Sequence, residues 1–192
     1  MKRLLVFAGL LTVATTLSAQ SSMPMGMQMG APKAPPKSPS ATATATIAGN
    51  AITIKYSSPR VNGRAGHIFT KDGLIGHDPT YPVWRAGANA ATNLHTEADI
   101  TIGDLAVPKG DYTLFVDITD PDKWVLIVNT LTGEWGLKYD KAKDLGRVKM
   151  KMSKPPALVE NLEYTIASKG GKKGALTLAW ENHSASVPIA VH

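Results

Sequence analysis

From residue 41 onward, apolar and polar side chains alternate along the chain with a period of two. The clearest example is the stretch 112–118, in which Tyr112, Leu114, Val116 and Ile118 fall on one face. Successive side chains of a β-strand point to opposite faces, so this period predicts half-buried strands rather than helices. The same alternation recurs at 52–56, 148–152, 162–166, 176–180 and 187–191, and 124–128 is a continuous apolar run typical of a strand covered on both faces.

Turn-forming residues separate these runs. The pair Gly49-Asn50 lies between two strand patterns and predicts a tight hairpin. One short helix is expected over 139–145, with Asp140 as its cap and Gly146 as its stop. Many short strands at near-regular spacing are typical of an all-β fold. We therefore expect an antiparallel β-sandwich, jelly-roll-like, with at most one short helix.

The N-terminus has the pattern of an export signal. Lys2 and Arg3 precede an apolar run from Leu4 to Leu17, and Ser18-Ala19 provides a small-residue cleavage site. The run is shorter than the roughly 20 apolar residues that span a bilayer. We interpret residues 1–19 as a signal peptide and expect an exported protein, periplasmic or secreted, with no transmembrane segment in the mature chain. The sequence contains no cysteine, which excludes disulfides and a lipid-attached signal.

Residues 20–40 differ in composition from the rest of the chain. They are rich in Ser, Met, Gly, Pro and Lys and have no apolar period, which predicts a disordered Met/Pro-rich linker before a sandwich domain at 41–192. Thioethers are soft ligands that favour Cu(I), so the linker methionines are a candidate copper site, although low-complexity composition alone also explains them. These methionines are Met23, Met25, Met27 and Met29.

The charge and the motif content exclude several classes of function. The formal charge of +6 becomes +4 once Lys2 and Arg3 are removed with the signal, and the remaining lysines are scattered. With no dense basic block and no nucleic-acid-binding motif, we expect no nucleic-acid partner. The chain has no nucleophile elbow, zinc-protease motif or phosphate-binding glycine loop, and we expect no cofactor. A small molecule or a glycan remains a possible partner, and the oligomeric state is left open.

The stretch from Tyr81 to Asn93 concentrates hydrogen-bonding side chains between two strand patterns. A guanidinium such as that of Arg85 suits a carboxylate, a phosphate or several backbone carbonyls. Asn89 adds an amide, and Trp84 adds a flat apolar face. Two interpretations stay open, a ligand-binding surface and a polar brace that pins the loop. The candidate ligand-binding residues are Trp84, Arg85, Asn89, Thr92, Trp135 and Arg147.

Two further clusters carry side chains of potential chemical use. Exposed aromatic rings stack on sugars, and Trp135, which follows a Thr-Gly turn, is the expected surface ring, whereas Trp180 is expected in the core. Carboxylates near these rings are candidate acid–base pairs, and His95 with Glu97 share a strand face that suits an ion. The first cluster is Trp135, Tyr139, Asp140, Asp144 and Arg147, the second is Trp180, Glu181 and Asn182, and the acid pairs are Glu134 with Asp140 and Glu181 with Asp144.

Four segments in order along the chain resemble a family of exported bacterial proteins, domain of unknown function 2911. The segments are Val83–Thr92, Val107–Phe115, Trp135 through Asp144–Val148, and Trp180–Asn182 with Ala185–Pro188. The resemblance implies no established activity. Similar proteins carry Glu at the position of Ala90, so the resemblance implies the loss of that carboxylate here.

These observations favour one function and leave two alternatives. We expect a non-catalytic exported β-sandwich that binds a small molecule, glycan or envelope component through the loop of Trp84, Arg85 and Asn89. One alternative is a hydrolase or isomerase that uses carboxylates near Trp135 or Trp180. The other is an envelope structural or assembly protein, with an edge strand pairing to another chain.

Overall fold

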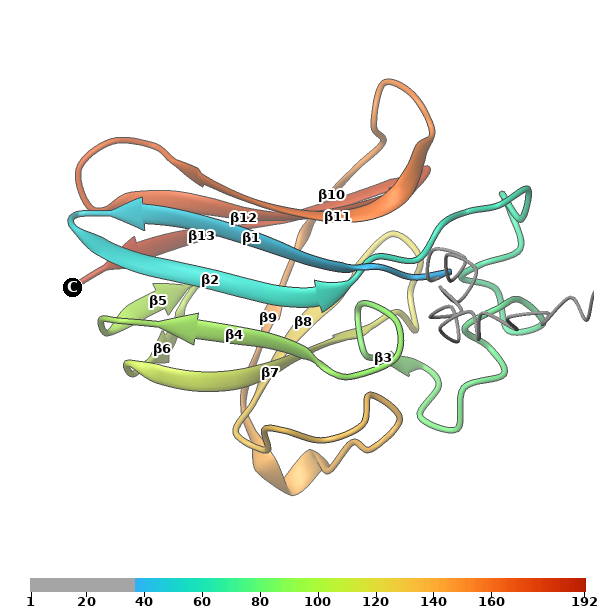
Figure 1. The fold of residues 1–192 in the computed structure, drawn as a ribbon, viewed down its shortest axis with the longest axis horizontal. Coiled ribbons are helices and arrows are strands. Elements are labelled where there is room, and N and C mark those ends of the chain that lie inside the picture. Colours follow the sequence, from blue (N-terminus) through green and yellow to red (C-terminus); the bar gives the residue numbers. More distant parts are fainter. Residues whose placement is uncertain (1–36) are drawn as a thin grey trace, which may run out of the picture. The chain divides into compact units, whose positions relative to one another are not determined.

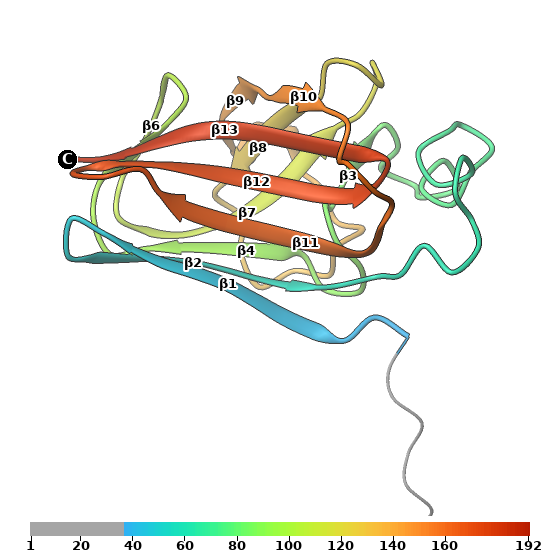
Figure 2. The same ribbon diagram turned by 90° about the horizontal axis from the view of Figure 1, so that it is seen from above.

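The computed structural model describes residues 37–192, which form two antiparallel β-sheets packed face to face (Figures 1 and 2). The predicted antiparallel sandwich is therefore confirmed. The first sheet has the order β1-β2-β4-β7-β8-β9 with β3 paired to β7, and the second has β11-β12-β13-β5-β6 with β10 paired to β13. The strands of the first sheet are β1 (Ser40–Ile47), β2 (Asn50–Ser57), β3 (Val83–Trp84), β4 (Thr92–Thr96), β7 (Gly110–Asp117), β8 (Val125–Asn129) and β9 (Asp144–Lys149). Those of the second are β5 (Ile100–Ile102), β6 (Leu105–Val107), β10 (Lys151–Ser153), β11 (Val159–Ser168), β12 (Lys173–Glu181) and β13 (His183–Val191).

The predicted signal peptide and most of the predicted linker, with its methionines, lie outside the described residues. Within residues 37–192, no helix has the length and the apolar character needed to cross a membrane.

The inward faces of the two sheets form the main core. The face predicted from the alternation in 112–118 is buried as expected, with Leu114 and Val116 fully shielded from solvent. From the opposite sheet, Leu176 and Leu178 on β12 are also buried. The outer side of the first sheet has a small second cluster in which Phe115 and Ile127 pack with Tyr139. Strand β8 is thus covered on both faces, which explains its continuous apolar sequence.

The hairpin between β1 and β2 turns one residue earlier than predicted. Ile47 pairs with Asn50, so Ala48 and Gly49 are the two turn residues, with φ of +50° and +81°. Positive φ at both central residues matches the strand twist in two-residue hairpins. Asn50 is the first residue of β2, where its side-chain amide donates to the carbonyl of Ala48.

The predicted short helix is a single 3-10 turn, Lys141–Lys143. Asp140 caps it as expected, since its carboxylate accepts the N–H of Ala142 at 2.9 Å. The turn ends before Gly146 because Asp144 already begins β9, where it pairs with Asn129 of β8. Tertiary strand pairing therefore overrides the local helix signal.

The connection from β2 to β3, residues 58–82, contains no helix and no regular strand. It lies at the end of the sandwich opposite the C-terminus (Figures 1 and 2). Its apolar side chains at Ile68 and Ile75 are buried in the main core. Connections of this length in compact domains are uncommon and are usually functional. This segment forms part of the wall of a cavity.

Candidate functional site

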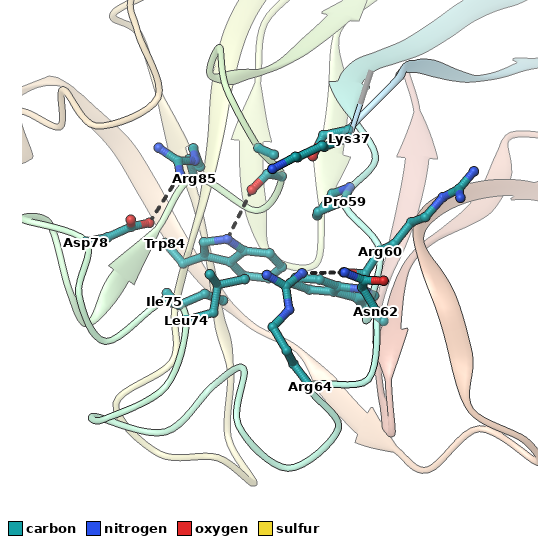
Figure 3. Close-up of a pocket in the computed structure, with 14 residues that line it drawn as sticks. Lys37, Pro59, Arg60, Asn62, Arg64, Leu74, Ile75, Asp78, Trp84 and Arg85 are labelled. Carbon is teal, nitrogen blue, oxygen red and sulfur yellow. Dashed lines mark hydrogen bonds and ion pairs between the residues drawn. The ribbon is translucent and has the colours of Figure 1, made fainter. Parts of the chain in front are cut away.

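A cavity of about 520 Å³ opens at the end of the sandwich, between the segment 58–82 and the chain that follows β3 (Figure 3). Two tryptophans from the core, Trp84 and Trp180, contribute to its lining. The remaining lining residues are Lys37, Ser38, Pro59, Arg60, Asn62, Arg64, Leu74, Ile75, Asp78, Arg85, Gly87 and Ala88.

The charged side chains that line the cavity are mostly cationic. Among the described residues that line it, Lys37, Arg60, Arg64 and Arg85 are accompanied by a single acid, Asp78. A concave surface lined by one sign of charge focuses its field and raises the local concentration of oppositely charged ligands. The cavity is therefore electrostatically suited to an anion.

Arg85 belongs to the cavity wall and has an incomplete set of partners. It follows β3, whose pairing with β7 fixes its backbone. One guanidinium nitrogen, Nη2, lies 3.4 Å from a carboxylate oxygen of Asp78, and the two side chains are 15% and 18% exposed. The Nε of Arg85 is buried and has no hydrogen-bond partner. A buried N–H without an acceptor costs free energy, a cost that an oxygen reaching this donor from a ligand would offset.

Arg64 enters the cavity from the segment 58–82 (Figure 3). Backbone carbonyls fix its guanidinium: Nε donates to Val61 at 3.0 Å and Nη2 donates to Arg60 at 2.7 Å. A guanidinium carries five N–H donors, so these bonds orient the group and leave donors free. The side chain of Arg60, by contrast, extends away from Trp84 (Figure 3).

The floor of the cavity is a stack of two buried indoles. The rings of Trp84 and Trp180 lie 5.8 Å apart at 21°, and each residue is 1% exposed. The ring of Phe69, from the segment 58–82, meets both edge-on, at 5.5 and 5.6 Å. The indole N–H of Trp84 donates to the carbonyl of Gly87 at 3.3 Å. Trp84 is thus a core residue beneath the cavity rather than an exposed stacking surface.

The loop after β3 is braced from within by the carbonyl of Ala86. This carbonyl accepts hydrogen bonds from the hydroxyls of Thr92, at 3.1 Å, and Tyr164, at 3.0 Å. Ala86 is fully buried with φ of +50°, so the two bonds hold a backbone conformation that alanine rarely adopts. Thr92 is therefore a brace, as one of the two sequence interpretations predicted.

Asn89 and Trp135 lie together, but neither is among the described residues that line the cavity. The carbonyl of Asn89 accepts the N–H of Gly136 at 3.2 Å, and Ala90 forms an isolated bridge with Trp135. Trp135 is 58% exposed and Trp180 is buried, which confirms both expectations of burial. Ala90 is also exposed.

Arg147 belongs to a separate polar network on β9. Its Nε lies 3.0 Å from Asp144, its Nη1 lies 3.3 Å from Asp117, and its Nη2 donates to the hydroxyl of Tyr139 at 2.6 Å. That hydroxyl donates in turn to Asp144 at 2.8 Å. Burial raises the pKa of Tyr139 to about 12, so the hydroxyl stays protonated at neutral pH and keeps this bond. The network engages all three guanidinium nitrogens of Arg147 and lies outside the cavity lining.

The candidate acid–base and metal-binding residues each have other partners. Glu134 pairs with Lys138 at 2.8 Å, and Asp140 caps the 3-10 turn. His95 pairs with Asp111 at 2.9 Å, while Glu97 accepts the backbone N–H of Ala51. No group of three or more His, Cys, Asp or Glu residues placed to share a metal ion occurs within residues 37–192.

Several cavity residues were not identified from the sequence, namely Lys37, Arg60, Arg64 and Asp78. Arg60, Arg64 and Asp78 lie on the segment 58–82, which has no hydrophobic period, and Lys37 joins them only through tertiary packing. One signal in the sequence could have pointed to this cavity. Residues 58–82 form a long stretch without strand alternation, and two arginines lie near its start.

The comparisons with known proteins identify the family. No curated protein and no solved structure matches the chain. The sequence model of the family described as "Protein of unknown function (DUF2911)" matches residues 38–189. This range includes both sheets except the last two residues of β13, the whole segment 58–82, and all but one of the residues that line the cavity. The chain therefore belongs to the DUF2911 family, as the resemblance of its motifs indicated.

Proposed function

We propose that the protein binds a small molecule bearing a carboxylate or phosphate group in the cavity lined by Arg64 and Arg85. The observation that carries this proposal is the buried, unpartnered Nε of Arg85 in a cavity whose charged residues are four cations and one acid. Planar guanidinium groups form paired hydrogen bonds to carboxylate and phosphate oxygens. Binding, rather than catalysis, is the role that this arrangement supports.

An anion is favoured over a glycan by the placement of the aromatic rings. Sugar binding through stacking needs exposed aromatic faces close to hydrogen-bonding groups. Of the tryptophans in the chain, Trp84, Trp124 and Trp180 are buried, and Trp135 is exposed outside the cavity. The cavity thus offers charge and hydrogen-bond donors rather than an open aromatic platform.

Arg85 and Asp78 are expected to affect anion affinity in opposite directions. Arg85→Ala should weaken the binding of inorganic phosphate by about tenfold or more, because a hydrogen bond to a charged group contributes roughly 1.5–3 kcal/mol. Asp78→Asn should strengthen binding, since it removes the one carboxylate that competes for Arg85. Titration calorimetry of residues 37–192 with phosphate, at constant ionic strength, measures both effects.

The matched control is Lys141→Ala, which removes one positive charge from an exposed residue of the 3-10 turn outside the cavity. Equal affinity losses in the Arg85 and Lys141 variants would show diffuse charge attraction and contradict the proposal. The thermal stability of Arg85→Ala without ligand is expected to stay close to that of the parent. A large loss would assign Arg85 a structural role instead.

We also propose that the protein is exported, on the basis of the charged start, apolar run and small-residue site in residues 1–19. Expression of the full chain in a bacterial host should yield a processed protein whose first residue is Gln20. Mass spectrometry of the intact secreted or periplasmic protein measures this. Recovery of the full-length chain from the cytoplasm alone would contradict export.

A further inference from the structure

Glu181 is a buried acid that ties the second sheet to the segment 58–82. It is the last residue of β12 and is 2% exposed. One carboxylate oxygen accepts the backbone N–H of Gly66, and the other lies 3.1 Å from Nδ1 of His183. Despite this distance, Nδ1 of His183 has no hydrogen-bond partner. The hydrogen bond that this carboxylate accepts within the described residues is therefore the one from Gly66.

The backbone at Glu181 is strained in a way that glycine would relieve. Trp180 pairs with His183, so Glu181 and Asn182 form a two-residue turn, and Glu181 has φ of +56°. Two-residue hairpin turns favour glycine at a first position with positive φ. A strained non-glycine residue points to a role for its side chain. Here that side chain reaches Gly66, far away in the sequence.

The bond to Gly66 stabilises the part of the cavity wall that contains Arg64. Ile68 and Ile75 anchor the middle of the segment in the core, but Asn62, Ala65, Gly66 and His67 are exposed. From outside the segment, two residues bond to this exposed part: Glu160, whose carbonyl and carboxylate accept the N–H groups of Val61 and Asn62, and Glu181. Gly66 is two residues from Arg64, whose carbonyl accepts the N–H of His67, so the loss of the Gly66 bond would loosen the backbone that follows Arg64.

We propose that Glu181 is a positioning residue for the anion cavity, acting through Gly66 to hold Arg64 in place. This inference rests on the proposed anion binding. Its carboxylate does not itself line the cavity, so its effect on the ligand is indirect, through Gly66 and Arg64 or through its neighbour Trp180, and the Arg64→Ala background separates these two routes. Arg85 is fixed separately by β3 and its contact with Asp78.

A double-mutant cycle with inorganic phosphate tests this route. Glu181→Ala alone should weaken phosphate binding by about fivefold, because a smaller fraction of molecules has Arg64 in place. In an Arg64→Ala background the same change should have almost no further effect, whereas in an Arg85→Lys background the full loss should remain. An equal loss in all three backgrounds, or none in the parent, would overturn the proposal.

Two further substitutions separate positioning from stability. Glu181→Gly relieves the backbone strain and should unfold at a higher temperature than Glu181→Ala, yet show the same loss of phosphate affinity. Glu181→Gln keeps an acceptor for Gly66 and should restore most of the affinity. If affinity follows the unfolding temperature across these variants instead, Glu181 is only structural. If Glu181→Ala does not fold, a comparison of phosphate affinity and unfolding temperature between Glu181→Gly and Glu181→Gln still separates the two roles.

The proposed function and this inference fail in different ways. If Arg64→Ala and Arg85→Lys leave phosphate binding of the parent unchanged, the anion cavity itself is wrong. If both weaken binding but Glu181→Ala behaves additively with Arg64→Ala, the cavity stands and the positioning role of Glu181 is wrong.

Discussion

Replacing Trp180 by alanine is expected to lower the free energy of unfolding by about 3–5 kcal/mol, the range for truncation of a large buried aromatic side chain. Trp180 is 1% exposed, stacks on Trp84 and contacts Phe69. The rings that contact it come from the first sheet and from the segment 58–82, so they cannot collapse into the space without breaking other contacts. Urea denaturation of residues 37–192, followed by circular dichroism, measures the change.

Trp135→Ala is the matched control for the same side chain. Trp135 is 58% exposed, and substitutions of exposed residues away from special features usually change stability by less than about 0.5 kcal/mol. Similar losses in the two variants would contradict the two-layer core from which every site assignment starts. A much larger loss of stability in Trp180→Ala than in Trp135→Ala would show that the aromatic cluster beneath the cavity is one of the main stabilising features of the domain.

The core was predictable because strand alternation is a local signal. Leu114, Val116, Leu176 and Leu178 were assigned to buried faces from their period alone, and each is at most 1% exposed. No such signal exists for registers and boundaries, which depend on the partner strand. The 3-10 turn is short because Asp144 pairs with Asn129.

The candidate site was only partly predictable, because it brings together residues from distant parts of the chain. Arg85 was identified from its loop, but Arg64 lies on a segment without periodicity and meets Arg85 only in the folded protein. Glu181 was considered as a candidate acid with Asp144. The structure instead gives it Gly66 and His183 as partners, while Asp144 bonds Asn129, Tyr139 and Arg147. Residue chemistry was visible in the sequence, whereas the pairing of residues was not.

The loop from Tyr81 to Asn93 combines the two roles that the sequence left open. Arg85 lines the cavity, while Thr92 holds the carbonyl of Ala86 from beneath. The two roles depend on each other, because Arg85 is the direct neighbour of Ala86. If the brace fails, the position of the guanidinium changes as well. Measuring how much the two hydrogen bonds to the Ala86 carbonyl stabilise the domain therefore tests how firmly Arg85 is held.

Removing both donors to the Ala86 carbonyl is expected to destabilise the domain by more than the sum of the two single changes. Thr92→Val and Tyr164→Phe each leave one donor in place, so each should cost about 0.5–1.5 kcal/mol. The double variant leaves a fully buried carbonyl without a partner, which adds an unsatisfied-group penalty, for a total of about 3–4 kcal/mol.

The control for this coupling pairs Tyr164→Phe with Thr113→Val. Thr113 is also a buried threonine, 2% exposed, but its hydroxyl donates to the carbonyl of Leu131 at 2.6 Å. Because the two donors serve different acceptors, this second double variant should be additive within about 0.5 kcal/mol. Urea denaturation of all five variants gives both coupling energies. Additive behaviour of Thr92 and Tyr164 would show that the Ala86 carbonyl finds another donor, and that the loop carrying Arg85 is held by contacts other than this brace.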